Sequence, residues 1–158
     1  IHGYINDEQL NDLLPLSNHF GLALQKVNIL KDMQDDVEEG RCYWPSSLLK
    51  KHGLSHDSLL EPAQHRQAIH RALKELRKNI QCDIEKSLEY IQLLPFEPKG
   101  VRIFCGDNLM FAIATVSAIS NDRPKISRED VLRIDNEVER IMSERKGFEE
   151  LASQLNRM

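Results

Sequence analysis

Apolar residues recur at three- and four-residue steps over most of the chain, which is the periodicity of α-helices with one buried face. This pattern predicts one long helix over residues 14–39, ended by Gly40. A loop with a short helical turn follows, for which Ser46 is the expected N-cap. A second long amphipathic helix is expected over residues 62–94, a run that holds no glycine and no proline after its first residue.

The rest of the chain continues in the same way. Residues 101–120 are apolar around almost the whole circumference, which is typical of a helix buried among others. The next predicted helix has Ser127 as its N-cap and Glu129 in its first turn, and residues 148–158 predict a last short one. No repeat and no alternating strand pattern is present. We therefore expect an all-α fold, with residues 1–158 in a single domain that is the C-terminal portion of a larger one.

Composition adds constraints on the setting of the protein. The 158 residues are 41% apolar and 29% charged, as in globular domains, and the net charge of −4 argues against a nucleic-acid partner. Three widely spaced cysteines without a C-x-x-C pair fit a reducing, cytoplasmic compartment. No uncharged apolar run reaches the length of a membrane span, so no transmembrane segment is expected. The first residues read as the interior of a longer protein.

One segment, NILKDMQDDVEEGRCYWP at residues 28–45, carries an unusual density of acidic side chains. Five carboxylates fall within eight positions before the first arginine: Asp32, Asp35, Asp36, Glu38 and Glu39. Like charges one helical turn apart cost roughly 0.2–0.5 kcal/mol per pair on an exposed surface. A positive charge is therefore expected to bind there.

Helical spacing places part of this segment on one stripe. Gly21, Gln25, Asn28, Asp32 and Asp36 step by four, three, four and four, so they share a face about 80° wide. Apolar residues border the stripe on both sides, which predicts a polar lining inside a helical bundle. Gly21 carries no side chain there and leaves room for a ligand.

Two carboxylates at this spacing suit Mg²⁺, which takes one or two carboxylates and completes its shell with water and substrate phosphate oxygens. Lys31 and Arg41 are then placed to contact the remaining phosphate charge. The composite prediction is a diphosphate site. The alternative is a solvated acidic helix end, which composition alone favours, because D-x-x-x-D by itself occurs by chance in many helices.

The same residues resemble a known family. GLALQKVNILKDMQDDVEEGRCYWP contains Q-x-x-N-I-L-x-D-x-x-x-D followed by G-R-x-x-W-P, and it resembles the second aspartate-rich segment of the squalene and phytoene synthases, the head-to-head trans-isoprenyl diphosphate synthases. VRIFCGDNLMFAIATVSAISN is similar to their late helix. The Trp-Pro ending favours the squalene branch. The resemblance, over about residues 17–125, implies an isoprenoid synthase-type helical bundle around a deep apolar cavity.

The activity that this resemblance implies is the Mg²⁺-dependent joining of two farnesyl diphosphates through presqualene diphosphate, followed by reduction to squalene with NADPH. Asp32 and Asp36 match the family's metal ligands, and Asn28 and Gln25 match the polar residues beside them. Gly21 belongs to the same expected substrate face.

The resemblance also assigns residues around the diphosphate. Lys31 and Arg41 match bases that face it, and Phe104 matches an aromatic on the cavity wall, where a ring faces carbocation intermediates. The family's first aspartate-rich motif and catalytic tyrosine have no match within residues 1–24, so the N-terminal half of the same enzyme is an expected partner. After Cys105, the residues Gly106, Asp107 and Asn108 differ from the eukaryotic pattern, so the resemblance assigns no residues to NADPH binding.

Three functions stay open. The first is a squalene synthase, the second a phytoene or dehydrosqualene synthase that lacks the reduction, and the third a non-catalytic helical interaction module derived from the family. A lipophilic product predicts peripheral contact with a membrane. The basic residues of KELRKNIQ at positions 74–81 are expected to face solvent.

Overall fold

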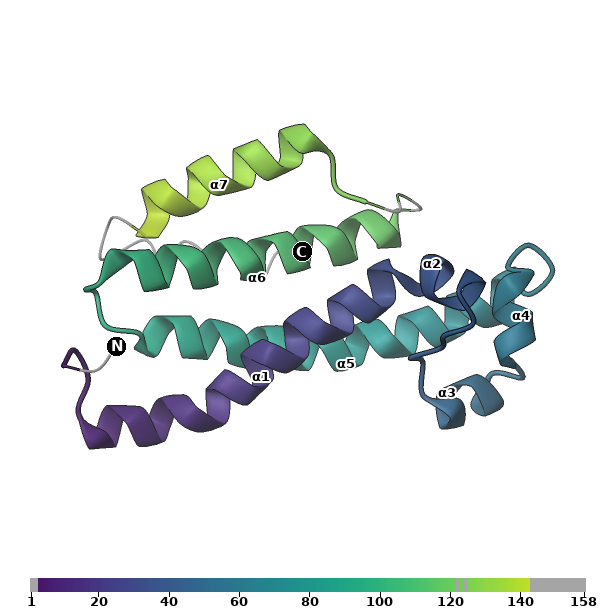
Figure 1. Cartoon of the computed structure of the whole chain (residues 1–158), viewed down its shortest axis with the longest axis horizontal. Helices are drawn as coiled ribbons and strands as arrows, with labels where there is room; N and C mark the ends of the chain where they lie inside the picture. The colour runs from purple at the N-terminus through teal and green to yellow at the C-terminus, as the bar shows by residue number, and fades with distance from the viewer. Residues whose placement is uncertain (1–2, 122, 124, 143–158) are drawn as a thin grey trace.

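A computed structural model describes residues 3–121, 123 and 125–142, and within these residues the chain forms seven α-helices and no strand (Figure 1). The expected all-α fold class is confirmed for this part of the chain. In order, the helices are α1 (Asp7–Lys31), α2 (Met33–Glu38), α3 (Ser46–Lys51), α4 (His56–Leu60), α5 (Arg66–Leu93), α6 (Lys99–Ser120) and α7 (Arg128–Met142). The short helix expected at residues 148–158 lies outside the described residues.

The first helix begins earlier than the hydrophobic pattern predicts. The Asn6 side chain accepts a hydrogen bond from the Gln9 amide at 2.8 Å, and the Gln9 side chain accepts one from the Asn6 amide at 3.0 Å. This capping box satisfies two backbone donors at the helix start. α1 therefore starts at Asp7, and Pro15 lies inside it.

The expected single helix over residues 14–39 is also interrupted. α1 ends at Lys31, and Asp32 adopts φ −94° and ψ 8° before α2 begins at Met33. The end at Gly40 is confirmed. Gly40 has φ +77°, a left-handed conformation that glycine adopts without a steric penalty.

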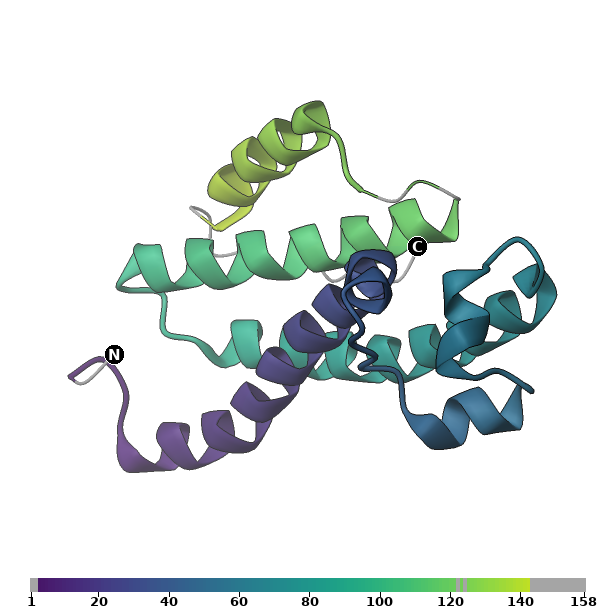
Figure 2. The ribbon, with the colours of Figure 1, turned by 45° about the vertical axis from the view of Figure 1, so that its right-hand side comes forward.

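The connection to α5 contains more structure than the sequence predicts. Ser46 is the first residue of α3 and Pro45 is its cap, so the expected Ser46 N-cap is wrong. α4 was not expected as a helix of its own, and the side chain of Ser55 caps it. α5 begins at Arg66, four residues after the expected start. Figures 1 and 2 show α3 and α4 at the end of the molecule where α5 begins.

The expected core helix is confirmed as α6, which lies between α5 and α7 and also contacts α1 (Figure 2). Of the helices described, α6 alone is long and apolar enough to cross a membrane by length and composition. Its contacts with three neighbours are those of a core helix. The expected N-cap of α7 is also confirmed, because the Ser127 hydroxyl accepts a hydrogen bond from the Asp130 amide at 3.0 Å.

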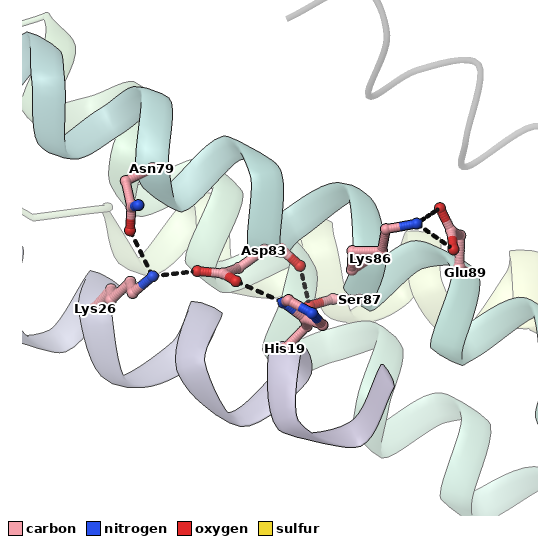
Figure 3. A network of polar contacts seen from close by, with 7 residues as sticks. All are labelled: His19, Lys26, Asn79, Asp83, Lys86, Ser87 and Glu89. Atoms are coloured by element: carbon pink, nitrogen blue, oxygen red, sulfur yellow. Dashed lines mark hydrogen bonds and ion pairs between the residues drawn. The ribbon is translucent and has the colours of Figure 1, made fainter. Parts of the chain in front are cut away.

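An ion network centred on the buried Asp83 holds α1 against α5 (Figure 3). The Asp83 side chain on α5 is 6% exposed, and it accepts hydrogen bonds from His19 Nδ1 at 2.8 Å and from Lys26 Nζ at 2.5 Å, both on α1. Lys26 also donates to the Asn79 side chain. Burial raises the pKa of Asp83, but the hydrogen bonds from Lys26 and His19 outweigh it, so the net pKa lies below the usual value. This network fixes the part of α1 that precedes the acidic segment.

Candidate functional site

The two aspartates of the predicted metal site stay one helical turn apart despite the break. The Asp32 amide donates to the Asn28 carbonyl at 2.9 Å, and the Asp36 amide donates to the Asp32 carbonyl at 2.9 Å. Because the i→i+4 hydrogen bonds continue through the break, the two side chains remain on one side of the chain. The Asp36 side chain is 17% exposed and that of Asp32 is 40% exposed.

The turn after α2 folds Arg41 back onto this acidic segment. The Arg41 amide donates to the Asp36 carbonyl at 2.7 Å, directly after the left-handed Gly40. The guanidinium then reaches Asp36 Oδ1 at 3.3 Å and also pairs with Glu39. The Glu39 carboxylate raises the pKa of Arg41 further, so the side chain is a permanent cation at this position.

The rest of the predicted stripe lies on an open surface. Gly21, Gln25 and Asn28 are all exposed in the described part of the chain. The expectation of a lining enclosed within a bundle is therefore not met by these residues alone. A methyl group built at Gly21 meets no atom within 4 Å, so the backbone there is accessible to a ligand or to another segment.

A pocket of about 440 Å³ opens beside the stripe, between α1, α6 and the start of α7. Asn28 and Lys31 line it from α1, Asn108 lines it from α6, and Lys125 comes from the connection to α7. Thr115 of α6 and apolar side chains of α1, α6, α7 and the segment before α7 complete the lining. Two cationic and two amide side chains over an apolar lining suit an amphiphile with an anionic head.

Of the predicted site residues, only Asn28 and Lys31 line this pocket. The lining does not include Gly21, Gln25, Asp32, Asp36, Arg41 or Phe104. Phe104 lies on α6 with 65% of its surface exposed and is not among the lining residues. Its backbone carbonyl accepts a hydrogen bond from the Asn108 side chain at 2.7 Å, so the pocket lies one turn further along α6. The expectation that residues 101–120 are buried on all sides is wrong for the face that carries Phe104.

Asp32 and Asp36 are the candidate cation ligands, and in the described structure Asp32 is paired with Lys31 and Asp36 with Arg41. Within the described residues no cluster of three or more histidine, cysteine or acidic side chains has the geometry of a metal site. Asp32 and Asp36 supply carboxylate oxygens on consecutive turns, and Lys31 Nζ lies 3.5 Å from Asp32 Oδ2. Mg²⁺ commonly takes one or two carboxylates together with water and phosphate oxygens. The two aspartates are consistent with that kind of site.

The pocket residues Asn108 and Lys125 were not among the predicted site residues. Asn108 lies four residues after Phe104, so helical spacing from that aromatic residue was a usable signal. Lys125 follows the end of α6 in an irregular segment, where no periodicity applies. Its approach to Lys31 depends on how α6 and α7 pack, which the sequence pattern does not reveal.

Comparison with known proteins finds similarity to one family. A sequence model of the family described as squalene/phytoene synthase matches residues 1–136. The chain is 30% identical over 115 residues to the squalene synthase of Schizosaccharomyces pombe, a match that covers 73% of this chain and 24% of that protein. It is 39% identical over 66 residues to the 15-cis-phytoene synthase of Enterobacter agglomerans, which covers 42% of this chain and 22% of that protein.

A third relative combines two activities in its name. The chain is 34% identical over 96 residues to the bifunctional lycopene cyclase/phytoene synthase of Pyrenophora tritici-repentis, covering 61% of this chain and 16% of that protein. No solved structure matches the chain. The matched region spans about a quarter or less of the length of these curated relatives.

Proposed function

The chain belongs to the squalene/phytoene synthase family, and we propose that it is the C-terminal portion of a prenyltransferase that joins two molecules of farnesyl diphosphate head to head. The observation that carries this proposal is the pair Asp32 and Asp36, held one turn apart beside a pocket lined by Asn28 and Lys31. An acidic pair next to cationic and amide side chains suits a metal-bound diphosphate.

Asp32 and Asp36 are the proposed ligands of Mg²⁺, and Asn28 and Gln25 orient the diphosphate beside them. When bound there, Mg²⁺ neutralises charge on the diphosphate and makes it a better leaving group. Arg41 holds Asp36 and Glu39 in the described structure, and it exchanges part of these contacts for diphosphate oxygens.

The remaining residues contact the prenyl chain and the rest of the diphosphate. Lys31 lines the pocket and supplies a point charge toward the diphosphate. Phe104 presents an exposed ring, which stabilises a carbocation through its π-face once the N-terminal half of the enzyme covers it. Gly21 leaves the backbone of α1 accessible to the prenyl chain of the substrate. A covered, apolar cavity then protects the cation from water.

We assign the squalene branch, with presqualene diphosphate as intermediate and NADPH as reductant. The Trp44–Pro45 ending supports this assignment, and so does the match to the fission yeast squalene synthase. The second candidate is a phytoene- or dehydrosqualene-type synthase without reduction, which the match to the 15-cis-phytoene synthase favours. These candidates differ in product and in their need for a reductant.

The experiment is product analysis of the complete polypeptide, incubated with farnesyl diphosphate and Mg²⁺ with and without NADPH. Squalene formed only with NADPH supports the first candidate. A C30 polyene formed equally in both incubations supports the second, and geranylgeranyl diphosphate then tests for phytoene. Recovery of no hydrocarbon and no prenyl diphosphate intermediate with either farnesyl or geranylgeranyl diphosphate leaves the helical interaction module as the function.

The proposed setting is the cytoplasm, with peripheral contact to a membrane that takes up the lipophilic product. α6 is the described helix that is long and apolar enough to span a bilayer, but it packs between α5 and α7. We therefore place the contact on the protein surface.

A further inference from the structure

A second groove lies between α5 and α6, away from the proposed diphosphate site. It has a volume of about 690 Å³, and Lys74, Arg77 and Lys78 line it from α5. Buried Ile84 and Ile113 form its deeper part, whereas Lys74 and Lys78 are exposed. The prediction that the basic residues at positions 74–81 simply face solvent is incomplete, because they form the rim of an apolar groove.

The basic surface continues toward the start of α5. An adjoining pocket of about 550 Å³ is lined by Arg66 and Arg71 and shares His70 and Ser120 with the larger groove. Residues 66–78 contain five lysines and arginines and one acidic residue, a net charge of +4 in a chain whose total is −4. This helix segment therefore carries a local excess of positive charge in an acidic chain.

The single acidic residue of this segment does not neutralise the groove. Glu75 accepts hydrogen bonds from Lys51 at 2.8 Å and from His52 at 3.1 Å, both outside the groove lining. These hydrogen bonds lower the pKa of Glu75, so its carboxylate stays ionised and paired with Lys51 and His52. Within the described part of the chain, the five cations of residues 66–78 make no ion pair. Over 13 residues this charge extends along about 20 Å of helix.

We propose that this basic groove is a docking surface for an anionic phospholipid bilayer. Phosphate groups of the lipid contact the lysines and arginines on the rim, and the glycerol and first acyl carbons contact the apolar lining. Clusters of four to eight basic residues on a helix bind anionic lipid in this way. Five cations spread over about 20 Å exceed what one small phosphate can contact, and the overall negative charge disfavours nucleic acid.

The test is flotation of the complete polypeptide with vesicles of phosphatidylcholine alone or with about 30% phosphatidylserine. We expect binding only to the anionic vesicles, and its loss in 0.5 M salt. Lys74→Gln/Lys78→Gln should lower the partition coefficient about 30-fold, since each basic side chain contributes about fivefold. The matched control Lys99→Gln/Arg128→Gln removes the same charge outside the groove and should change partitioning less than about threefold.

Several results would overturn this proposal. The first is no binding to anionic vesicles, and the second is an equal loss of vesicle binding in the two double variants. The third is calorimetric evidence that the protein binds inorganic diphosphate in the absence of vesicles and that this binding requires Lys74 and Lys78. The membrane contact and the condensation reaction are separable. Lys74→Gln/Lys78→Gln should retain turnover in detergent solution, whereas Asp32→Asn should lose turnover and retain vesicle binding.

Discussion

The ion network between α1 and α5 gives a quantitative prediction for Asp83→Asn. This substitution keeps the size of the side chain but removes the charge that Lys26 and His19 share at 2.5 and 2.8 Å. Breaking a fully buried ion pair costs about 3–5 kcal/mol. The Lys26 and His19 side chains are 31% and 39% exposed and regain water contact, so we expect a loss of about 2–3 kcal/mol in the free energy of unfolding.

The same helix offers a matched control, also drawn in Figure 3. Glu89 accepts two hydrogen bonds from Lys86, but both side chains are nearly half exposed. Exposed pairs contribute about 0–1 kcal/mol, so Glu89→Gln should cost about 0.5 kcal/mol or less.

Urea unfolding followed by circular dichroism at pH 7 measures both variants. The Asp83 pKa is lowered in the folded state, so its contribution is present above the unfolded pKa of about 3.9 and is lost as the pH falls through the folded pKa. The deficit of Asp83→Asn should therefore shrink below pH 4. Equal stabilities of the two variants at pH 7 would refute the assignment of Asp83 as the anchor between α1 and α5.

Three further predictions concern packing, pH and association. A Cβ at Gly106 would lie 2.8 Å from Val138 Cγ1, which is too close for an unstrained contact. Gly106→Ala should therefore lower the free energy of unfolding by about 1–2 kcal/mol, because the cost of overpacking exceeds the gain in helix propensity. An unchanged urea midpoint would contradict this prediction. Burial and the carboxylates of Asp135 and Glu139 raise the pKa of Asp107 to about 6. The folded protein therefore loses stability as the pH rises through 6 and this side chain ionises. The free energy of unfolding of Asp107→Asn should exceed that of the parent by about 1–2 kcal/mol at pH 7.5 but not at pH 4. Residues 1–158 expressed alone expose several large apolar side chains and should associate, as light scattering would show, and a monodisperse monomer would count against an uncovered cavity face.

The fold class follows from the sequence because helical periodicity is strong over α5 and α7, and because α6 is a long, almost uniformly apolar run between them. The boundaries were less predictable. Asn6 and Gln9 form a capping-box pair that was available as a signal, but the break at Asp32 gives none, because it keeps the hydrogen bond to Asn28. A single non-helical residue inside a continuous hydrogen-bond ladder does not disturb the hydrophobic pattern.

The candidate site divides in the same way. Helical spacing placed Asp32 and Asp36 on one face, since both lie on a nearly continuous helix. The α6 wall of the pocket and Lys125 depend on tertiary packing across about a hundred residues. Asp83 was missed for a different reason: a charged residue on an amphipathic helix is typical of a solvated face, and its burial depends on partners from α1.

The central claim is that Asp32 and Asp36 hold the metal of a diphosphate site. The most direct measurement is Mg²⁺-dependent turnover of farnesyl diphosphate by the complete polypeptide and its Asp32→Asn, Asp36→Asn and Asp35→Asn variants, with circular dichroism as a check on folding. Asp35 is the matched control because it is exposed and carries the same charge. We predict a loss of about 100-fold or more for Asp32→Asn and Asp36→Asn and less than about threefold for Asp35→Asn. Full activity of the first two variants, or an equal loss in all three, would contradict the claim.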